Sequence, residues 1–201
     1  MSQRVLVFLL AATAAVSAAP KFLNVYRAPD VAGLSFAGKK VAAVVITDDQ
    51  SLQMSAEESL TRELIARNVS GVASYRIMPR EEMKSAEKAR VWFERAAVQG
   101  VVALRPVSVR KEQRPNVVFT SGYYPSFWNY YGYGWTTAYA VPLSFDKTTT
   151  ITVETLVYDL TRDRLVWAAT SETEDAKTLQ RFITDLVKGA VAEMKKSKLI
   201  G

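Results

Sequence analysis

Apolar runs of strand length recur along the chain and predict a β-sheet. Residues 39–47 (KKVAAVVIT) form a nearly continuous apolar run, typical of a strand that is buried on both faces. Residues 72–78 predict a second, short strand. Residues 101–110 predict a third strand, which changes from wholly apolar to alternating, and Pro106 within it indicates a sheet edge or a β-bulge.

The C-terminal part of the chain shows first a strand period and then a helical one. Residues 148–159 alternate with period two, and a polar turn at residues 161–163 leads into another apolar run, so that together they predict a β-hairpin. Residues 179–194 carry apolar side chains at helical spacing throughout. Such a stripe predicts a helix that lies across a sheet.

Two further helices are expected between the first three strands. Ser55 and Glu58 form a capping box, which predicts a helix start. Pro79 indicates the start of a second helix, and Gly100 indicates its end. The buried stripe of this second helix is expected to contain Met83, Ala86, Phe93, Ala96 and Ala97.

The predicted order of elements is β-α-β-α-β, then an insert, then β-β-α. This order indicates the α/β (α+β) class, with a single-domain mixed sheet and helices packed on it over residues 39–200. The first three strands are expected to be parallel through helical crossovers, and the last two to be antiparallel. Residues 19–38, which contain Pro and Gly, are expected to form an irregular leader.

The first residues predict an exported protein. Arg4, the apolar run at residues 5–16 and the small residues that follow have the layout of a secretory signal peptide over residues 1–18, with cleavage after Ala18. The alternative is an uncleaved anchor, but a spanning helix needs about 20 apolar residues and this run is shorter. No later segment is long enough to span a bilayer. The expected location is therefore the periplasm or cell envelope of a bacterium.

Composition narrows the chemistry that the chain can perform. The 201 residues include no Cys and no His, which excludes a disulfide framework, a thiolate zinc site, a lipid-bearing Cys and every His-based nucleophile pair. Carboxylate-pair chemistry, a Ser-Lys pair and an all-oxygen metal site stay open. The net charge is +6, or +5 without Arg4, and this modest excess is scattered, so we expect no nucleic-acid binding.

An uncharged aromatic segment is the most distinctive feature of the sequence. Residues 115–145 contain no charged side chain, and nine aromatic residues lie between Tyr123 and Tyr139. Because Tyr and Trp are enriched at interfaces, we interpret the insert at residues 115–147 as a contact surface. An alternative is an ordered lid that folds its own rings over a sheet edge, and another is mobile low-complexity sequence. The candidate binding residues are Tyr124, Phe127, Trp128, Tyr130, Tyr131, Tyr133 and Trp135.

Carboxylates follow the first predicted strand, where α/β sheets often place ligands. Asp48 and Asp49, with Glu57 and Glu58 nearby, are able to hold a hard cation. The simpler interpretation is that the aspartates form a turn and the glutamates favour a helix N-terminus. We therefore predict no catalytic residues, no metal and no cofactor.

A set of segments occurs in one combination along the chain: GKKVAAVVITDD, AEESLTRELIARN, SYRIMP, GVVALRPVSV, the Tyr/Gly-rich insert and VETLVYDL followed by LVWAATSET. Together these segments resemble a family of small exported bacterial envelope proteins, often lipoproteins, of unassigned function. The strand-helix order is also similar to that of the α/β domain of the curli-secretion lipoprotein and of the N-terminal domain of the Tol-Pal propeller protein. This similarity implies architecture only.

The sequence therefore predicts a non-enzymatic, exported binding or assembly module. Its partner is expected to be an envelope protein or a glycan that contacts the aromatic insert, and oligomerisation stays open. The alternative function is a hydrolase or transferase that acts on envelope polymer through carboxylates such as Asp48, Asp49 or Glu154.

Overall fold

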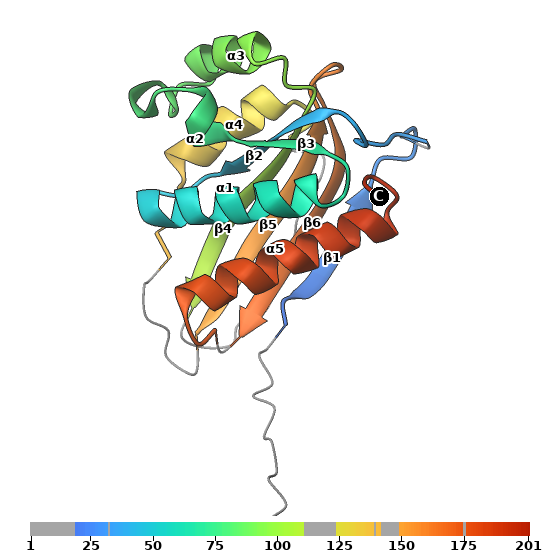
Figure 1. The fold of residues 1–201 in the computed structure, drawn as a ribbon. Coiled ribbons are helices and arrows are strands. Elements are labelled where there is room, and N and C mark those ends of the chain that lie inside the picture. The colour runs from blue at the N-terminus through green and yellow to red at the C-terminus, as the bar shows by residue number, and fades with distance from the viewer. Residues whose placement is uncertain (1–18, 32, 111–123, 139, 142–148, 175) are drawn as a thin grey trace, which may run out of the picture.

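A computed structural model shows one six-stranded mixed sheet with helices on both faces (Figure 1). The strand order across the sheet is β1-β6-β5-β4-β2-β3. This architecture confirms the predicted α/β class. The structure describes residues 19–31, 33–110, 124–138, 140–141, 149–174 and 176–201.

The strands alternate with helices along most of the chain. The strands are β1 (Lys21–Arg27), β2 (Lys40–Val45), β3 (Ser70–Ala73), β4 (Gly100–Arg110), β5 (Thr150–Asp159) and β6 (Arg164–Glu174). The helices are α1 (Gln50–Ile65), α2 (Ser74–Ile77), the 3-10 turn η1 (Arg80–Glu82), α3 (Ala86–Arg95), α4 (Phe127–Thr136) and α5 (Leu179–Lys196).

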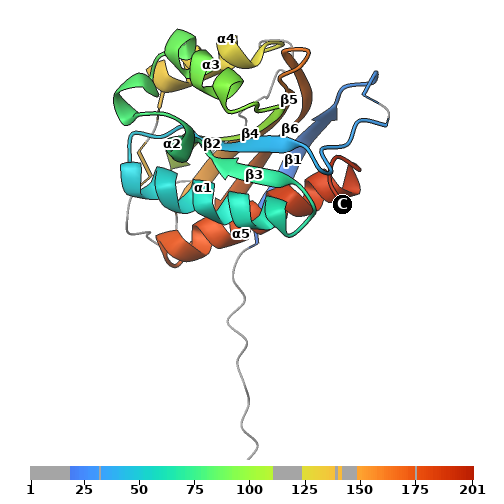
Figure 2. The ribbon, with the colours of Figure 1, turned by 45° about the horizontal axis from the view of Figure 1, so that its top comes forward.

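Two helical layers enclose the sheet. Helices α1 and α5 lie side by side over one face, and α3 and α4 lie over the other, as Figure 2 shows. Each face has its own apolar core. The first core includes Leu60 of α1, Trp167 of β6 and Val187 of α5, and the second includes Phe93 of α3 and Tyr158 of β5. Within the described residues, no helix is long and apolar enough to cross a membrane.

Strand directions agree with the sequence-based expectation. Strand β2 is parallel to both β3 and β4, and β5 and β6 form the predicted antiparallel hairpin. Pro106 does not mark a sheet edge, because β4 lies inside the sheet. It does mark a bulge, since the register with β5 shifts between Pro106 and Ser108. The pairing of β4 with β2 ends at Leu104, so the missing N–H of Pro106 removes no bond on that side.

The predicted irregular leader was wrong for residues 21–27, which form edge strand β1 against β6. A bulge explains why the strand has no clear period in the sequence. The register shifts between Leu23 and Tyr26, and Asn24 has a φ of 50°. The bulge interrupts the alternation of apolar and polar side chains on which a strand prediction depends.

Three predicted boundaries also differ from the structure. Helix α1 starts before the predicted capping box, and its N-cap is Asp49, whose side chain accepts a hydrogen bond from the backbone N–H of Leu52. The second predicted strand ends at Ala73, where α2 begins. Gly100 opens β4 instead of ending a helix, since α3 already ends at Arg95. The absence of a side chain at Gly100 lets Phe36 pack directly on it. A Cβ there would lie 2.3 Å from Phe36 Cε1.

Candidate functional site

The described residues 124–138 of the aromatic segment fold largely as helix α4, which lies on the sheet. Its N-terminus is capped by the turn of the β5–β6 hairpin. The backbone N–H of Phe127 donates to Asp163 Oδ1 at 2.9 Å, and the Ser126 hydroxyl donates to Asp163 Oδ2 at 2.6 Å. Because the segment has no carboxylate of its own, the hairpin supplies the anion that favours a helix N-terminus. An acceptor 36 residues away in the chain gives no local sequence signal.

Four of the seven candidate binding residues are packing residues in this structure. Phe127, Tyr130 and Tyr131 have no exposed surface and Trp135 is 8% exposed. Their spacing of three, four and eight residues places them on one side of the helix. They form a cluster of tilted and edge-on rings with Phe93 and Tyr158. The predicted contact surface is therefore smaller than the sequence suggested.

Three candidates retain access to solvent. Tyr133 is 44% exposed, and Tyr124 and Trp128 are half-buried. The rest of the predicted insert at residues 115–147, namely residues 115–123, 139 and 142–147, lies outside the described residues. A contact role for the described part of the insert thus depends on Tyr133 and its immediate neighbours.

Glycines let α4 approach the elements beneath and beside it. A Cβ on Gly134 would lie 2.7 Å from Ile46 Cδ1, so a larger side chain at this position requires the Ile46 side chain to shift. A Cβ on Gly132 would lie at an ordinary contact distance, 3.7 Å from Ala86 Cβ of α3. The Tyr131 hydroxyl also donates to the Met83 carbonyl at 2.5 Å. Helix α4 is therefore a fixed part of the fold.

A buried ion pair lies beneath the C-terminal half of α4. Arg105 of β4 and Glu154 of β5 are directly opposite in register, and each side chain is 7% exposed. Arg105 Nη2 donates to Glu154 Oε2 at 2.8 Å, and Arg105 Nη1 donates to Thr137 Oγ1 at 2.8 Å. Burial lowers the pKa of Arg105, but Tyr130 and Glu154 raise it more, so the net pKa lies above its ordinary value.

The guanidinium of Arg105 orders two aromatic rings. It lies 5.7 Å from the ring centroid of Tyr130 and 5.2 Å from that of Tyr133. Tyr133 in turn packs on Tyr124, with 5.2 Å between centroids. We call Arg105, Glu154, Tyr124, Tyr133 and Thr137 the arginine-tyrosine cluster. Sequence reasoning missed the role of Arg105, although a lone charge inside an apolar strand, matched by Glu154 in another, is a signal for such a pair.

Cations lie against rings repeatedly on this side of the sheet. The pairs are Arg76 with Tyr75, Lys84 with Trp135, Arg90 with Trp128 and Arg95 with Trp92, at 5.4 to 5.8 Å. Significant contacts of this kind occur about once per 70–80 residues in proteins. Their concentration in the α2–α4 layer gives that layer ordered side chains of the types that dominate binding hot spots.

The carboxylates proposed for a cation site or for hydrolysis have separate structural partners. Asp49 caps α1, and exposed Asp48 forms an ion pair with Lys84 at 3.0 Å. Glu154 is held by Arg105 on the sheet. Among the described residues no group of three or more carboxylates is placed to hold a metal ion.

Glu57 joins three elements from a buried position. Its carboxylate accepts hydrogen bonds from the N–H groups of Val45 and Tyr75 and from the side chains of Gln53 and Ser74, at 2.7 to 3.0 Å. Burial raises the pKa of Glu57 to about 7, against the lowering effect of these donors. The group therefore ties α1 to β2 and α2, a role that its predicted place at a helix N-terminus did not suggest.

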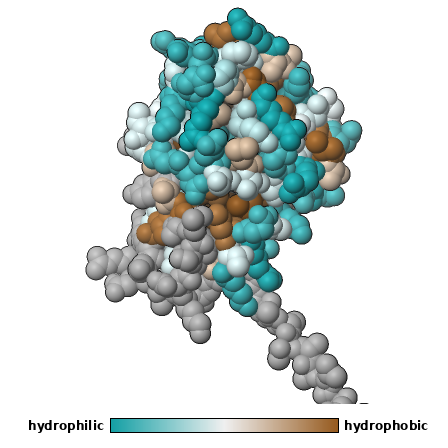
Figure 3. Space-filling view, turned by 60° about the vertical axis from the view of Figure 1, so that its left-hand side comes forward, coloured by the Kyte–Doolittle hydropathy of each residue, from teal (hydrophilic) through white to brown (hydrophobic). Residues whose placement is uncertain are grey.

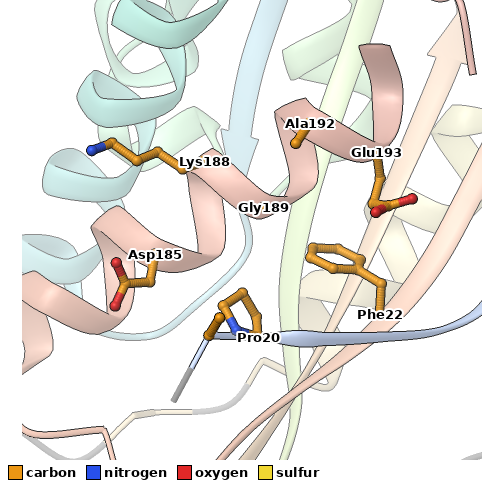
Figure 4. Close-up of a pocket in the computed structure, with 8 residues that line it drawn as sticks. Pro20, Phe22, Asp185, Lys188, Gly189, Ala192 and Glu193 are labelled. Atoms are coloured by element: carbon orange, nitrogen blue, oxygen red, sulfur yellow. The ribbon is translucent and has the colours of Figure 1, made fainter. Parts of the chain in front are cut away.

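One cavity lies away from α4, between the start of β1 and α5 (Figure 4). It has a volume of about 370 Å³ and is lined by Pro20 and Phe22 on one side and by Asp185, Lys188, Gly189 and Glu193 on the other. Gly189 admits the ring of Phe22, since a Cβ there would lie 2.7 Å from Phe22 Cε2. The cavity thus results from the packing of the start of β1 against α5.

Comparisons with known proteins give similar solved structures only. No protein-family model matches the chain, and no curated protein matches it. Two structures of PelC dodecamers from Paraburkholderia phytofirmans are similar, one of them of a variant with a single substitution. The variant has 16% identity and a TM-score of 0.47, with coverage of 86% of this chain and 96% of that chain. The other has 15% identity and a TM-score of 0.47, with coverage of 86% and 95%. At these values the likeness carries no argument about activity, partner or assembly.

Proposed function

We propose that the protein is an exported binding or assembly module of the bacterial cell envelope, which contacts its partner through the outer side of α4. The observation that carries this proposal is the exposure of Tyr133. Of the large apolar side chains that the structure describes as exposed, Tyr133 is the aromatic one. It also belongs to the ordered arginine-tyrosine cluster. Ordered Tyr, Trp and Arg side chains lose little conformational entropy on binding, which favours a contact role.

Export is supported by the predicted signal peptide, whose removal is compatible with every described strand and helix. The predicted cut after Ala18 precedes Lys21, the first residue of β1. Cleavage there would leave every described strand and helix in the mature chain. Detection of the cut form, with Ala19 at its N-terminus, in the periplasmic fraction tests this part of the proposal by mass spectrometry.

A site-specific crosslink in living cells tests the contact. A photoreactive phenylalanine analogue replaces Asn129, which is exposed on α4, or Ile65, which is 57% exposed on α1 across the sheet. We expect a discrete crosslinked product from position 129 that disappears when Tyr133→Ala is added, and no such product from position 65. Equal products from both positions, or a product from position 129 that is insensitive to Tyr133→Ala, would refute the contact role of α4.

A further inference from the structure

The outward side of α4 is polar, uncharged and regular. Asn129, Tyr133 and Thr136 are exposed and recur at spacings of four and three residues, so they form one stripe along the helix. The stripe offers an amide and a phenol, which donate and accept hydrogen bonds, and a hydroxyl that accepts them. The Thr136 hydroxyl donates its own proton to the Tyr133 carbonyl at 2.7 Å, so its oxygen serves as the acceptor. None of these groups carries charge.

Tyr133 is held in place before any partner arrives. Its ring lies against Tyr124 with an interplanar angle of 32° and against the guanidinium of Arg105. Arg105 is itself fixed by Glu154 and Thr137. Binding of a ligand to this ring therefore costs little conformational entropy, because the fold already holds the side chain in place.

The cations near the stripe are neutralised by neighbouring acids. Lys84 pairs with Asp48, Arg90 pairs with Glu94 at 3.1 Å, and Arg105 pairs with Glu154. Each charge that approaches the aromatic layer from these three positions is thus matched. A strongly charged ligand therefore gains little electrostatic binding energy at this surface, which favours a neutral polar ligand.

The amount of exposed apolar surface argues against a large protein partner. In the α3–α4 layer, the large apolar side chains that the structure describes as exposed are Val91 and Tyr133. On the face in Figure 3, apolar side chains gather beside the grey segments, while the upper part of the molecule carries isolated ones. A standard protein interface buries about 800 Å² on each partner around a cluster of apolar anchors. One exposed ring among amide and hydroxyl groups is instead suited to a sugar, which presents C–H groups and hydroxyls together.

From these observations we infer that the α4 stripe binds a neutral glycan, with pyranose units in contact with Tyr133 and a sugar hydroxyl that donates a hydrogen bond to Thr136 Oγ1. This inference rests on the proposed contact role of α4. It specifies the partner further, as a carbohydrate without net charge.

Titration calorimetry or NMR with purified protein and defined hexasaccharides tests the class. The neutral probes are β-1,4-linked N-acetylglucosamine and β-1,4-linked glucose, and the charged probes are deacetylated glucosamine (cationic) and galacturonate (anionic). We expect a neutral probe to bind at low millimolar concentration, with an affinity that changes less than about twofold between low and high salt, because no ion pair forms. A preference for a charged probe, or failure of both neutral probes, overturns the inference.

Variants show whether the binding uses the stripe. Tyr133→Ala is expected to weaken the neutral probe about tenfold or more. The matched control is Val91→Ala on α3, since Val91 has the same 44% exposure, and it should leave affinity unchanged. Equal losses in the two variants would overturn the inference. If no glycan binds while the crosslink from position 129 still depends on Tyr133, the glycan class fails and the contact role stands; if both tests fail, both proposals fall.

Discussion

The carboxylate of Asp163 accepts a hydrogen bond of 2.9 Å from the backbone N–H of Phe127. This bond joins the β5–β6 turn to the first residue of α4. Asp163 is able to do so because it has a φ of 44°, in the left-handed region that Asp tolerates in tight turns. The hairpin was predicted from the sequence, but its function as a cap for a distant helix was not. This contact makes the ordering of α4 dependent on the hairpin.

Asp163→Ala should therefore lower the free energy of unfolding by about 1–2 kcal/mol, through loss of the cap and of the Ser126 hydrogen bond. Urea denaturation followed by tryptophan fluorescence measures the change. The control is Arg162→Ala in the same turn. The Arg162 side chain is 61% exposed, and its Nε lies 3.9 Å from Asp159 Oδ2. We expect that variant to unfold like the parent. Equal effects of the two substitutions would show that the turn, and not the cap, matters.

Two glycines of α4 give a matched pair of stability predictions. Gly→Ala inside a helix ordinarily stabilises by about 1 kcal/mol. Gly132→Ala should follow that rule, because the nearest neighbour of the added Cβ would be 3.7 Å away. Gly134→Ala should instead destabilise by about 1–3 kcal/mol, because the added Cβ would lie 2.7 Å from Ile46, a fully buried side chain in the close-packed core. Stabilisation by both substitutions would mean that α4 does not pack on Ile46 as closely as described.

The Arg105–Glu154 pair should respond in a non-additive way. Arg105→Met leaves a buried carboxylate without its cation and is expected to cost about 3–5 kcal/mol. Addition of Glu154→Leu removes that uncompensated charge, so the double variant should recover most of the loss. Denaturant titration of the two single variants and the double variant gives the coupling. Additive losses would show that the two side chains do not form a pair.

Stability should also depend on the protonation of Glu57. Its pKa is raised from 4.5 to about 7 in the fold, so between these values the folded state holds one more proton than the unfolded state. The contribution of this group is fully present below the unfolded pKa and is lost as the pH rises through 7. We expect the free energy of unfolding to fall by about 1–3 kcal/mol from about pH 5 to about pH 8.

The control for this pH dependence is Glu57→Gln, which has no proton to release. Its unfolding free energy should stay nearly constant over the same range. Gln places an amide group where Tyr75 now donates, so the variant is expected to be less stable at every pH. A slope that persists in Glu57→Gln would assign the pH dependence to another group.

Periodicity was sufficient for most of the fold. The buried run at β2 and the stripe of α5 each reflect local burial, which a sequence records directly. The alternation of β5 predicted the strand, although its polar Thr152 and Glu154 are buried as well. Strand β1 was not predicted, because the bulge at Asn24 breaks the alternation of its side chains. Helix α4 was not predicted either, because Gly132, Gly134 and the clustered tyrosines are poor helix formers. Packing on the sheet outweighs their low helix propensity.

The candidate site was only partly accessible to sequence reasoning. An uncharged aromatic segment indicated the part of the chain on which the proposal rests, but it did not distinguish Tyr133, which is exposed, from Tyr130, which is buried. That distinction requires the helical phase of α4. The support from Arg105 and the cap from Asp163 come from strands and turns far away in the chain, and only the fold brings them to α4.

The most direct test of the contact role is sedimentation of the purified mature protein with washed envelopes of its host. The account predicts saturable binding by the parent and by Val91→Ala, and loss of that binding in Tyr133→Ala, which should still fold and unfold in one cooperative transition. Binding of all three proteins to the same extent, or of none of them, would contradict it.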